Sequence, residues 1–255
     1  MVTDNKSCGL VEREYGMKGF LLIHGKGTGP IAEYESALMN LYEELQPHGL
    51  IDYRDYGWAK DRIYSRTVEE SISDIEEARL DLISAGADKD EIYVVGYSLG
   101  GNMGIAYSGI HGEKIKGLIL LDPGHTLHTI KFQSTTRESY LKAKEAVENG
   151  RGDDILDLND MNNGEITELK SPAKNFYSFF NPLGLANMQL SSAKIMKPMN
   201  VLLISALLSP VTKTVAGIYN NINKTNKSTM VSLNTDHKGV PPLSLPYILN
   251  WIKTL

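Results

Sequence analysis

The stretch Val94-Val95-Gly96-Tyr97-Ser98-Leu99-Gly100-Gly101 decides the fold of this chain. It joins an apolar run, typical of a buried strand, to a small-residue-rich segment with the composition of a helix packed closely on a sheet. Glycines at positions 96 and 100 permit a turn between the two that side chains would obstruct. Such a turn holds the Ser98 hydroxyl above the sheet, at the positive end of the following helix, and makes Ser98 the candidate nucleophile.

Apolar runs elsewhere in the chain predict the rest of a sheet. Each is unbroken and is soon followed by turn-forming residues, as strands buried on both faces of a parallel sheet are. These runs are 20–23, 92–95, 118–121 and 201–204, with weaker strands near 51–56 and 229–234. Helical patterns lie between them at Glu35 to Gln46, at Val68 to Leu82 after the capping box Thr67-x-x-Glu70, at Leu99 to Ile110, and near the C-terminus, where Pro246 stands close to the expected helix start. The alternation predicts an α/β fold with a mostly parallel sheet flanked by helices.

One region interrupts this alternation. Residues 123–198 contain no strong strand pattern, only a charged helix at Arg137 to Val147, a polar stretch and an aromatic cluster that includes Phe179 and Phe180. A segment of this length between two strands is typical of an inserted lid or cap. We therefore expect a core domain from residues 1–122 and 199–255, and a lid or cap from residues 123–198. The two phenylalanines have two interpretations, packing beneath the insertion or contact with a substrate.

A second motif ends the first strand, where Phe20-Leu21-Leu22-Ile23 runs into His24-Gly25-Lys26-Gly27. Acyl transfer passes through an oxyanion, which backbone N–H groups stabilise. We expect one such N–H from Leu99 and the other from Lys26. His24 itself is predicted to hold the loop by a hydrogen bond.

These motifs resemble the α/β-hydrolase superfamily, in which His-Gly, Gly-x-Ser-x-Gly and a late histidine occur in the same order. The resemblance is to serine esterases and lipases. Trp58-x-x-x-Arg62-x-Tyr64, Pro123-Gly124-His125 and Tyr177-x-x-Phe180-x-Pro182 are similar to poorly characterised bacterial members. The resemblance to the superfamily implies the α/β-hydrolase fold and a Ser–His–acid triad, with no metal and no cofactor.

The candidate base is His237, in Asn234-Thr235-Asp236-His237-Lys238-Gly239, between the last expected strand and the last helix. The family's catalytic histidine has this place, from which it takes the serine proton and returns it to the leaving group. His125 and His128, at the start of the insertion, are the alternatives. His48 and His111 fall in expected surface turns.

The candidate acid is Asp122. The position at which the family usually carries the acid is Ser209 here, and no carboxylate occurs between Asn200 and Asn234. Some family members, pancreatic-type lipases among them, place the acid one strand earlier in a Leu-Asp-Pro sequence, which Leu121-Asp122-Pro123 matches. A turn-forming aspartate before proline is the other interpretation. Asp236 adjoins His237, and that adjacency turns its side chain elsewhere.

The sequence predicts a serine hydrolase that cleaves carboxylic esters, with thioesters or amides as the alternative substrates. Its partner is a small-molecule acyl substrate, which we expect Tyr97, His125, Phe179 and Phe180 to contact. The alternative is a binding or regulatory protein on the same fold, without useful turnover.

Composition limits the other classes of function. The 255 residues carry a net charge of −5 with scattered Lys and Arg, which predicts neither nucleic-acid binding nor attraction to anionic membranes. The sequence has no apolar run long enough to span a membrane, and its N-terminus, which holds the lone Cys8, lacks the pattern of a signal peptide. We expect a cytoplasmic protein; a leader upstream of Met1 would instead make it periplasmic or secreted.

Overall fold

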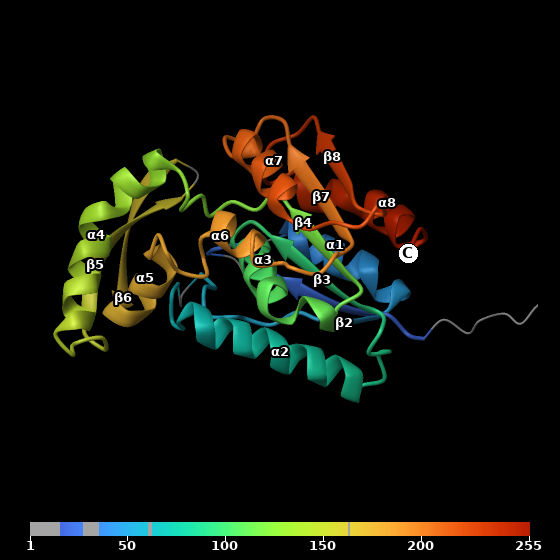
Figure 1. The fold of residues 1–255 in the computed structure, drawn as a ribbon, viewed down its shortest axis with the longest axis horizontal. Helices are drawn as coiled ribbons and strands as arrows, with labels where there is room; N and C mark the ends of the chain where they lie inside the picture. Colours follow the sequence, from blue (N-terminus) through green and yellow to red (C-terminus); the bar gives the residue numbers. More distant parts are fainter. Residues whose placement is uncertain (1–15, 28–35, 61–62, 163) are drawn as a thin grey trace, which may run out of the picture.

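A twisted parallel sheet forms the centre of the protein (Figure 1). The computed structural model describes residues 16–27, 36–60, 63–162 and 164–255, so Cys8 and Arg62 lie outside the described residues. All six strands of this sheet run parallel, in the order β2 (Leu50–Asp52), β1 (Gly19–Ile23), β3 (Ile92–Tyr97), β4 (Gly117–Leu121), β7 (Val201–Ala206) and β8 (Thr229–Leu233). The four strands expected from unbroken apolar runs are confirmed, and each is buried on both faces. Of the two weaker ones, β8 matches its expected range, whereas β2 covers only Leu50–Asp52 of the strand expected near 51–56.

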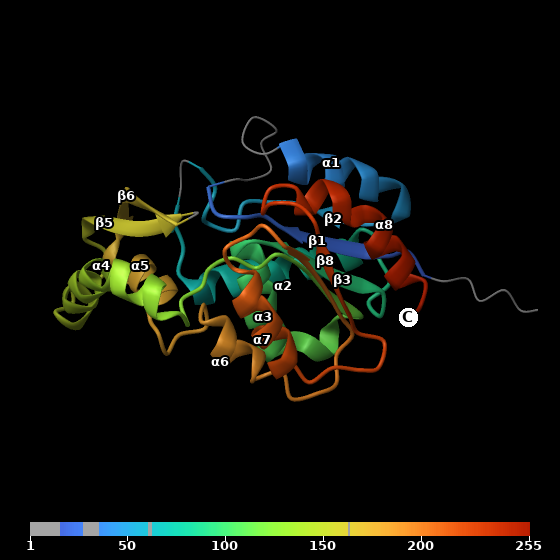
Figure 2. The same cartoon turned by 90° about the horizontal axis from the view of Figure 1, so that it is seen from above.

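Helices cover both faces of the sheet (Figure 2). On one face lie α1 (Ser36–Leu45) and α8 (Val240–Ile252), and on the other α2 (Val68–Ser84), α3 (Leu99–His111), α6 (Met188–Ser192) and α7 (Thr212–Asn221). Short 3-10 turns follow α1 (Gln46–His48) and α3 (Gly112–Lys114). The expected start of the last helix near Pro246 is wrong, since α8 begins at Val240 with prolines in its first turn and Pro246 lies in its interior.

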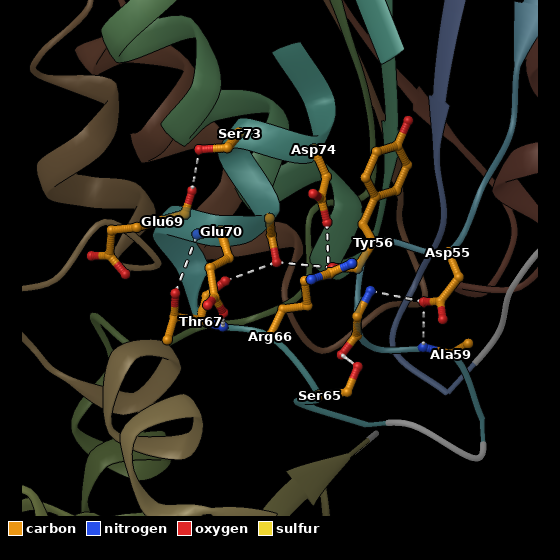
Figure 3. A network of polar contacts seen from close by, with 12 residues as sticks. Asp55, Tyr56, Ala59, Ser65, Arg66, Thr67, Glu69, Glu70, Ser73 and Asp74 are labelled. Carbon is orange, nitrogen blue, oxygen red and sulfur yellow. Dashed lines mark hydrogen bonds and ion pairs between the residues drawn. The ribbon is translucent and has the colours of Figure 1, made fainter. Parts of the chain in front are cut away.

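The start of α2 is fixed by the predicted capping box, which is confirmed (Figure 3). Thr67 Oγ1 accepts from the Glu70 N–H at 3.2 Å, and the Thr67 N–H donates to Glu70 Oε2 at 2.7 Å. Just before the helix, Arg66 forms an ion pair with Asp74 at 2.8 Å. The chain segment that leads from β2 to α2 is therefore tied to the first turns of α2.

Residues 130–180, which fall within the expected lid or cap of residues 123–198, lie beside the sheet (Figure 1), and we call this segment the insertion. It consists of α4 (Ile130–Glu148), an antiparallel hairpin of β5 (Ile155–Asn162) and β6 (Glu165–Pro172), and α5 (Ala173–Phe180). The sequence shows no strong strand pattern in this region, and the structure nevertheless forms a hairpin there. Only one face of the hairpin is covered, so its strands are largely polar and have no continuous apolar run. Asn163-Gly164, the dipeptide preferred in two-residue hairpin turns, is the signal that indicates the hairpin.

No helix within the described residues is long and apolar enough to cross a membrane.

Candidate active site

Ser98 stands in the turn between β3 and α3 with a strained backbone. Its φ of 53° and ψ of −118° lie in a region of backbone conformation that residues other than glycine rarely adopt. The neighbouring glycines make this turn possible, because an added Cβ at Gly96 would lie 2.4 Å from the Gly100 carbonyl oxygen. A Cβ at Gly100 would lie 2.2 Å from the carbonyl oxygen of Ile23 on β1. Close packing of β1, β3 and α3 thus fixes the place of the hydroxyl.

Asp122 and His237 meet at the carboxyl end of the sheet. Asp122 follows β4 and is fully buried, and His237 follows β8. His237 Nδ1 donates to Asp122 Oδ2 at 2.6 Å, and the Ala206 N–H donates to Asp122 Oδ1 at 3.2 Å. Both carboxylate oxygens are thus bound by donors, which compensates the burial of the charge.

Tyr97 supports the imidazole from the other side. Its ring stacks on His237 with centroids 4.9 Å apart, and its hydroxyl donates to the His237 carbonyl oxygen at 3.4 Å. The imidazole is therefore held both by the carboxylate and by an aromatic face.

Ser98 and His237 converge on the space above Gly124. A Cβ at Gly124 would lie 3.0 Å from Ser98 Oγ and 3.5 Å from His237 Cε1. The Gly124 N–H donates to the Ser98 carbonyl oxygen at 3.2 Å, which anchors this glycine beside the nucleophile. Sequence reasoning did not assign Gly124 to the site, although Pro123-Gly124 directly follows Asp122.

The loop after β1 passes close to Ser98. A Cβ at Gly25 would lie 3.2 Å from Ser98 Cβ, and the Gly27 N–H donates to the Trp58 carbonyl oxygen at 2.9 Å. Among the described residues, neither the Lys26 nor the Leu99 backbone N–H has a hydrogen-bond acceptor. These two groups are free to bind an oxyanion. His24 is fully buried and accepts from the Tyr56 N–H at 3.4 Å, which supports its predicted structural role.

A cavity of about 270 Å³ opens in front of these groups. Its described wall consists of Lys26, Ser98, Leu99 and His237 together with parts of 124–132, 161–164 and 209–214. Most of this wall is apolar, and no carboxylate is part of it. Ser209, which stands where the family usually carries the acid, lies in this wall.

His125 also lines the cavity, as predicted for a substrate contact. Its Nε2 donates to the Phe179 carbonyl oxygen at 3.0 Å. Burial, and next the nearby positive charge of Lys26, lower the pKa of His125 to about 4. The imidazole is therefore neutral at physiological pH.

Three other predicted substrate contacts lie elsewhere. Phe179 and Phe180 are buried in the aromatic core of the insertion, where Phe180 stacks on Phe176, and neither lines the cavity. The helix α5 turns these rings towards Tyr64 and α4, away from the solvent side. Tyr97 is covered by His237 and likewise does not line the cavity. Packing, the other interpretation of the phenylalanines, is the one that the structure supports.

The remaining candidates are set apart from this arrangement. His128 does not line the cavity, and its ring nitrogens have no hydrogen-bond partner among the described residues. Asp236 Oδ1 accepts from the Gly239 N–H at 2.9 Å, so this carboxylate points away from the imidazole as expected. Within the part of the chain that the structure describes, no group of three or more His, Cys, Asp or Glu side chains is arranged to hold a metal ion.

The strand order, with a strained serine after β3 and a histidine after β8, defines the class of proteins with the α/β-hydrolase fold. The family model described as the alpha/beta hydrolase fold matches residues 21–151 of this sequence. The chain belongs to this family, and the resemblance inferred from the sequence is confirmed. A search of curated proteins found no match.

Solved structures similar to this one include lipolytic enzymes. The monoacylglycerol lipase of Paleococcus ferrophilus is 18% identical with a TM-score of 0.66, over 94% of this chain and 96% of that chain. A structure from work on the metagenome-derived lipolytic enzymes LipS and LipT is 17% identical with a TM-score of 0.63, over 94% and 95%. Est1E from Butyrivibrio proteoclasticus is 16% identical with a TM-score of 0.57, over 93% and 89%. At these identities the likeness shows a shared fold.

Proposed function

We propose that the protein is a serine hydrolase that cleaves carboxylic esters through an acyl-enzyme on Ser98, with His237 as base and Asp122 as acid. The observation that carries this proposal is the 2.6 Å hydrogen bond from His237 Nδ1 to the fully buried Asp122 carboxylate. This bond fixes the tautomer in which Nε2 has a free lone pair, as proton abstraction from a serine hydroxyl requires.

The reaction then has two halves. His237 Nε2 takes the Ser98 proton while Oγ attacks the ester carbonyl carbon, and the negative charge develops on the carbonyl oxygen, where the Lys26 and Leu99 N–H groups bind it. Collapse of this intermediate expels the alcohol, which receives its proton from the imidazolium. In the second half, His237 takes a proton from water, which attacks the acyl carbon of the acyl-enzyme. The carboxylic acid product is released, and Ser98 regains its proton from the imidazolium.

The cavity favours a small or medium acyl group. Its volume of about 270 Å³ lies just below the roughly 300–1,000 Å³ of pockets that take drug-sized ligands. Apolar wall residues such as Phe132, Met161 and Val211 suit an aliphatic chain. Because the described residues that line the cavity include Lys131 and no carboxylate, an uncharged or anionic acyl group is favoured over a cationic one. The similar structures described above as a lipase and as lipolytic enzymes also favour an ester substrate.

The strained turn also argues for catalysis over the alternative of a binding protein. A non-glycine residue in such a conformation costs about 1–3 kcal/mol of folding free energy, and such strained residues cluster at functional sites. A protein that only binds ligands gains nothing from a strained serine that lies beside a histidine paired with a buried aspartate.

Labelling with a fluorophosphonate probe tests the proposal directly. We expect one equivalent of probe on the wild-type protein, none on Ser98→Ala, and full labelling of Ser209→Ala, a matched control in the wall of the same cavity. A panel of p-nitrophenyl esters of increasing acyl length then measures kcat/KM, which we expect to fall once the chain outgrows the cavity. A folded wild-type protein that neither labels nor hydrolyses any ester of the panel would leave the binding-protein alternative.

A further inference from the structure

A buried carboxylate in the insertion points at the loop that follows β1. Asp160 lies on β5, where burial alternates along the strand, and its side chain is only 2% exposed. Burying a charge is costly unless it is paired. The groups that pair with Asp160 therefore indicate the role of this buried carboxylate.

The first partner is Lys26. Lys26 Nζ donates to Asp160 Oδ2 at 2.5 Å and to the Met161 carbonyl oxygen at 3.1 Å, and the lysine side chain is 8% exposed. The two residues are 134 positions apart in the sequence. One residue thus offers its backbone N–H to the proposed oxyanion site and its side chain to the insertion.

The second partner is Tyr64, whose hydroxyl donates to Asp160 Oδ2 at 3.0 Å. The Tyr64 carbonyl oxygen accepts from Asn175 Nδ2 at 2.9 Å and from Ser171 Oγ at 3.2 Å. Tyr64 belongs to the segment that the network of Figure 3 ties to α2. Asp160 is consequently held by Tyr64, whose backbone is tied to the insertion, and by its own strand, where the Met161 N–H donates to Oδ1 at 2.6 Å.

We propose that Asp160 is a positioning residue for ester hydrolysis: through its ion pair with Lys26 it holds the loop after β1 so that the Lys26 N–H points at the oxyanion. This inference rests on the proposed function. Within the described part of this loop, the neighbouring backbone anchor is the hydrogen bond from the Gly27 N–H to the Trp58 carbonyl oxygen at 2.9 Å. Buried ion pairs contribute little net stability but fix geometry. A slip of β5 by one residue would turn Asp160 outwards and release Lys26.

Such a role has its own kinetic signature. The oxyanion exists only near the transition state, so misalignment of its donor lowers kcat and leaves substrate binding nearly unchanged. Removal of one oxyanion donor costs about 10²–10³ in kcat, and misalignment by a fraction of an ångström costs part of this. We therefore expect Asp160→Asn to lower kcat about 10–100-fold, with KM within about threefold of the wild type.

The matched control is Asp157→Asn on the same strand. Asp157 is exposed and pairs with Lys170 on β6 at 3.6 Å, so the substitution removes the same charge without touching the loop. We expect its kcat to remain within twofold of the wild type. Lys26→Met should reproduce the loss of Asp160→Asn, and the two losses should not add in the double variant, because both break one contact. Lys26→Arg should restore part of the rate.

A trifluoromethyl ketone, which forms a tetrahedral oxyanion on an active serine, separates positioning from stability. Its inhibition constant should rise by the same factor by which kcat/KM falls in Asp160→Asn, and fluorophosphonate labelling counts the folded sites in each sample. If folded Asp160→Asn keeps a kcat within threefold of the wild type, the inference is overturned and the proposed function stays intact. If Asp160→Asn does not fold, the same criterion applies to folded Lys26→Met. A rise in KM alone would also overturn it. A wild-type protein without ester hydrolysis overturns both.

Discussion

Replacing Asp122 by Asn probes the proposed acid with almost no change in shape. Asp122 Oδ1 accepts from the Ala206 N–H at 3.2 Å, and Oδ2 accepts from His237 Nδ1 at 2.6 Å. In the variant, the amide oxygen keeps the bond with Ala206, so the amide nitrogen faces the imidazole. Since that nitrogen can only donate, His237 has to accept at Nδ1 and carry its proton on Nε2.

The wrong tautomer removes the base. With its proton on Nε2, His237 cannot take the proton of Ser98, and the imidazolium that forms during attack loses its counter-charge. The equivalent change in other triads lowers kcat by about 10⁴. We expect a fall of about 10³–10⁴ here, equivalent to about 4–5.5 kcal/mol of transition-state stabilisation.

The assay is steady-state hydrolysis of p-nitrophenyl butyrate, with thermal unfolding as a check on folding. Asp236→Asn is the matched control, because this neighbour of His237 caps the Gly239 N–H and faces away from the imidazole. We expect the control to retain at least a third of the wild-type kcat. A folded Asp122→Asn variant with kcat within tenfold of the wild type would refute the assignment of Asp122 and the tautomer argument with it.

Three further predictions concern the surroundings of the nucleophile. Gly124→Ala places a Cβ about 3.0 Å from Ser98 Oγ and should lower kcat/KM at least about 100-fold with little change in the melting temperature, measured by ester hydrolysis and calorimetry. Gly100→Ala places a Cβ 2.2 Å from the Ile23 carbonyl oxygen and should abolish folding, measured by circular dichroism, whereas Gly217→Ala, with open space around its Cβ, should fold. Because the pKa of His125 is lowered to about 4 in the folded protein, the unfolded chain binds a proton at this residue first as the pH falls. The free energy of unfolding should therefore decrease between pH 6.5 and pH 4, by up to about 3 kcal/mol from this residue. Urea unfolding of His125→Asn should show a smaller decrease over the same pH range.

The sheet and the serine turn were predictable because their signals are local. Runs such as Val201 to Ile204 are apolar without alternation, which few structures other than a doubly covered strand allow. The glycines around Ser98 report on the same tight turn that the structure shows. The position of Asp122 near His237 was predictable because Asp122 directly follows such a strand, and sites of α/β proteins are built at the carboxyl ends of the strands.

The insertion was predicted less well because its contacts are distant. The burial of Asp160 depends on Lys26 and Tyr64, which no local pattern connects to β5. Phe179 and Phe180 lie on a strongly amphipathic helix, and only the packing of α5 on α4 decides that they face the insertion's core instead of the cavity. Periodicity shows that a side chain is buried, but which cavity or core receives it is a property of tertiary packing.

The position of Asp122, the proposed acid, directly after β4 has a consequence for how this scaffold can change. Because Asp122 supplies the contact to His237, the turn after β7 carries no part of the proposed proton relay, and its residues Ser209, Pro210 and Val211 form cavity wall instead. Variation in this turn can reshape the proposed acyl site and leave the contact between Asp122 and His237 untouched. A combinatorial library confined to these three positions is therefore the natural starting point for evolving new acyl selectivity in this protein.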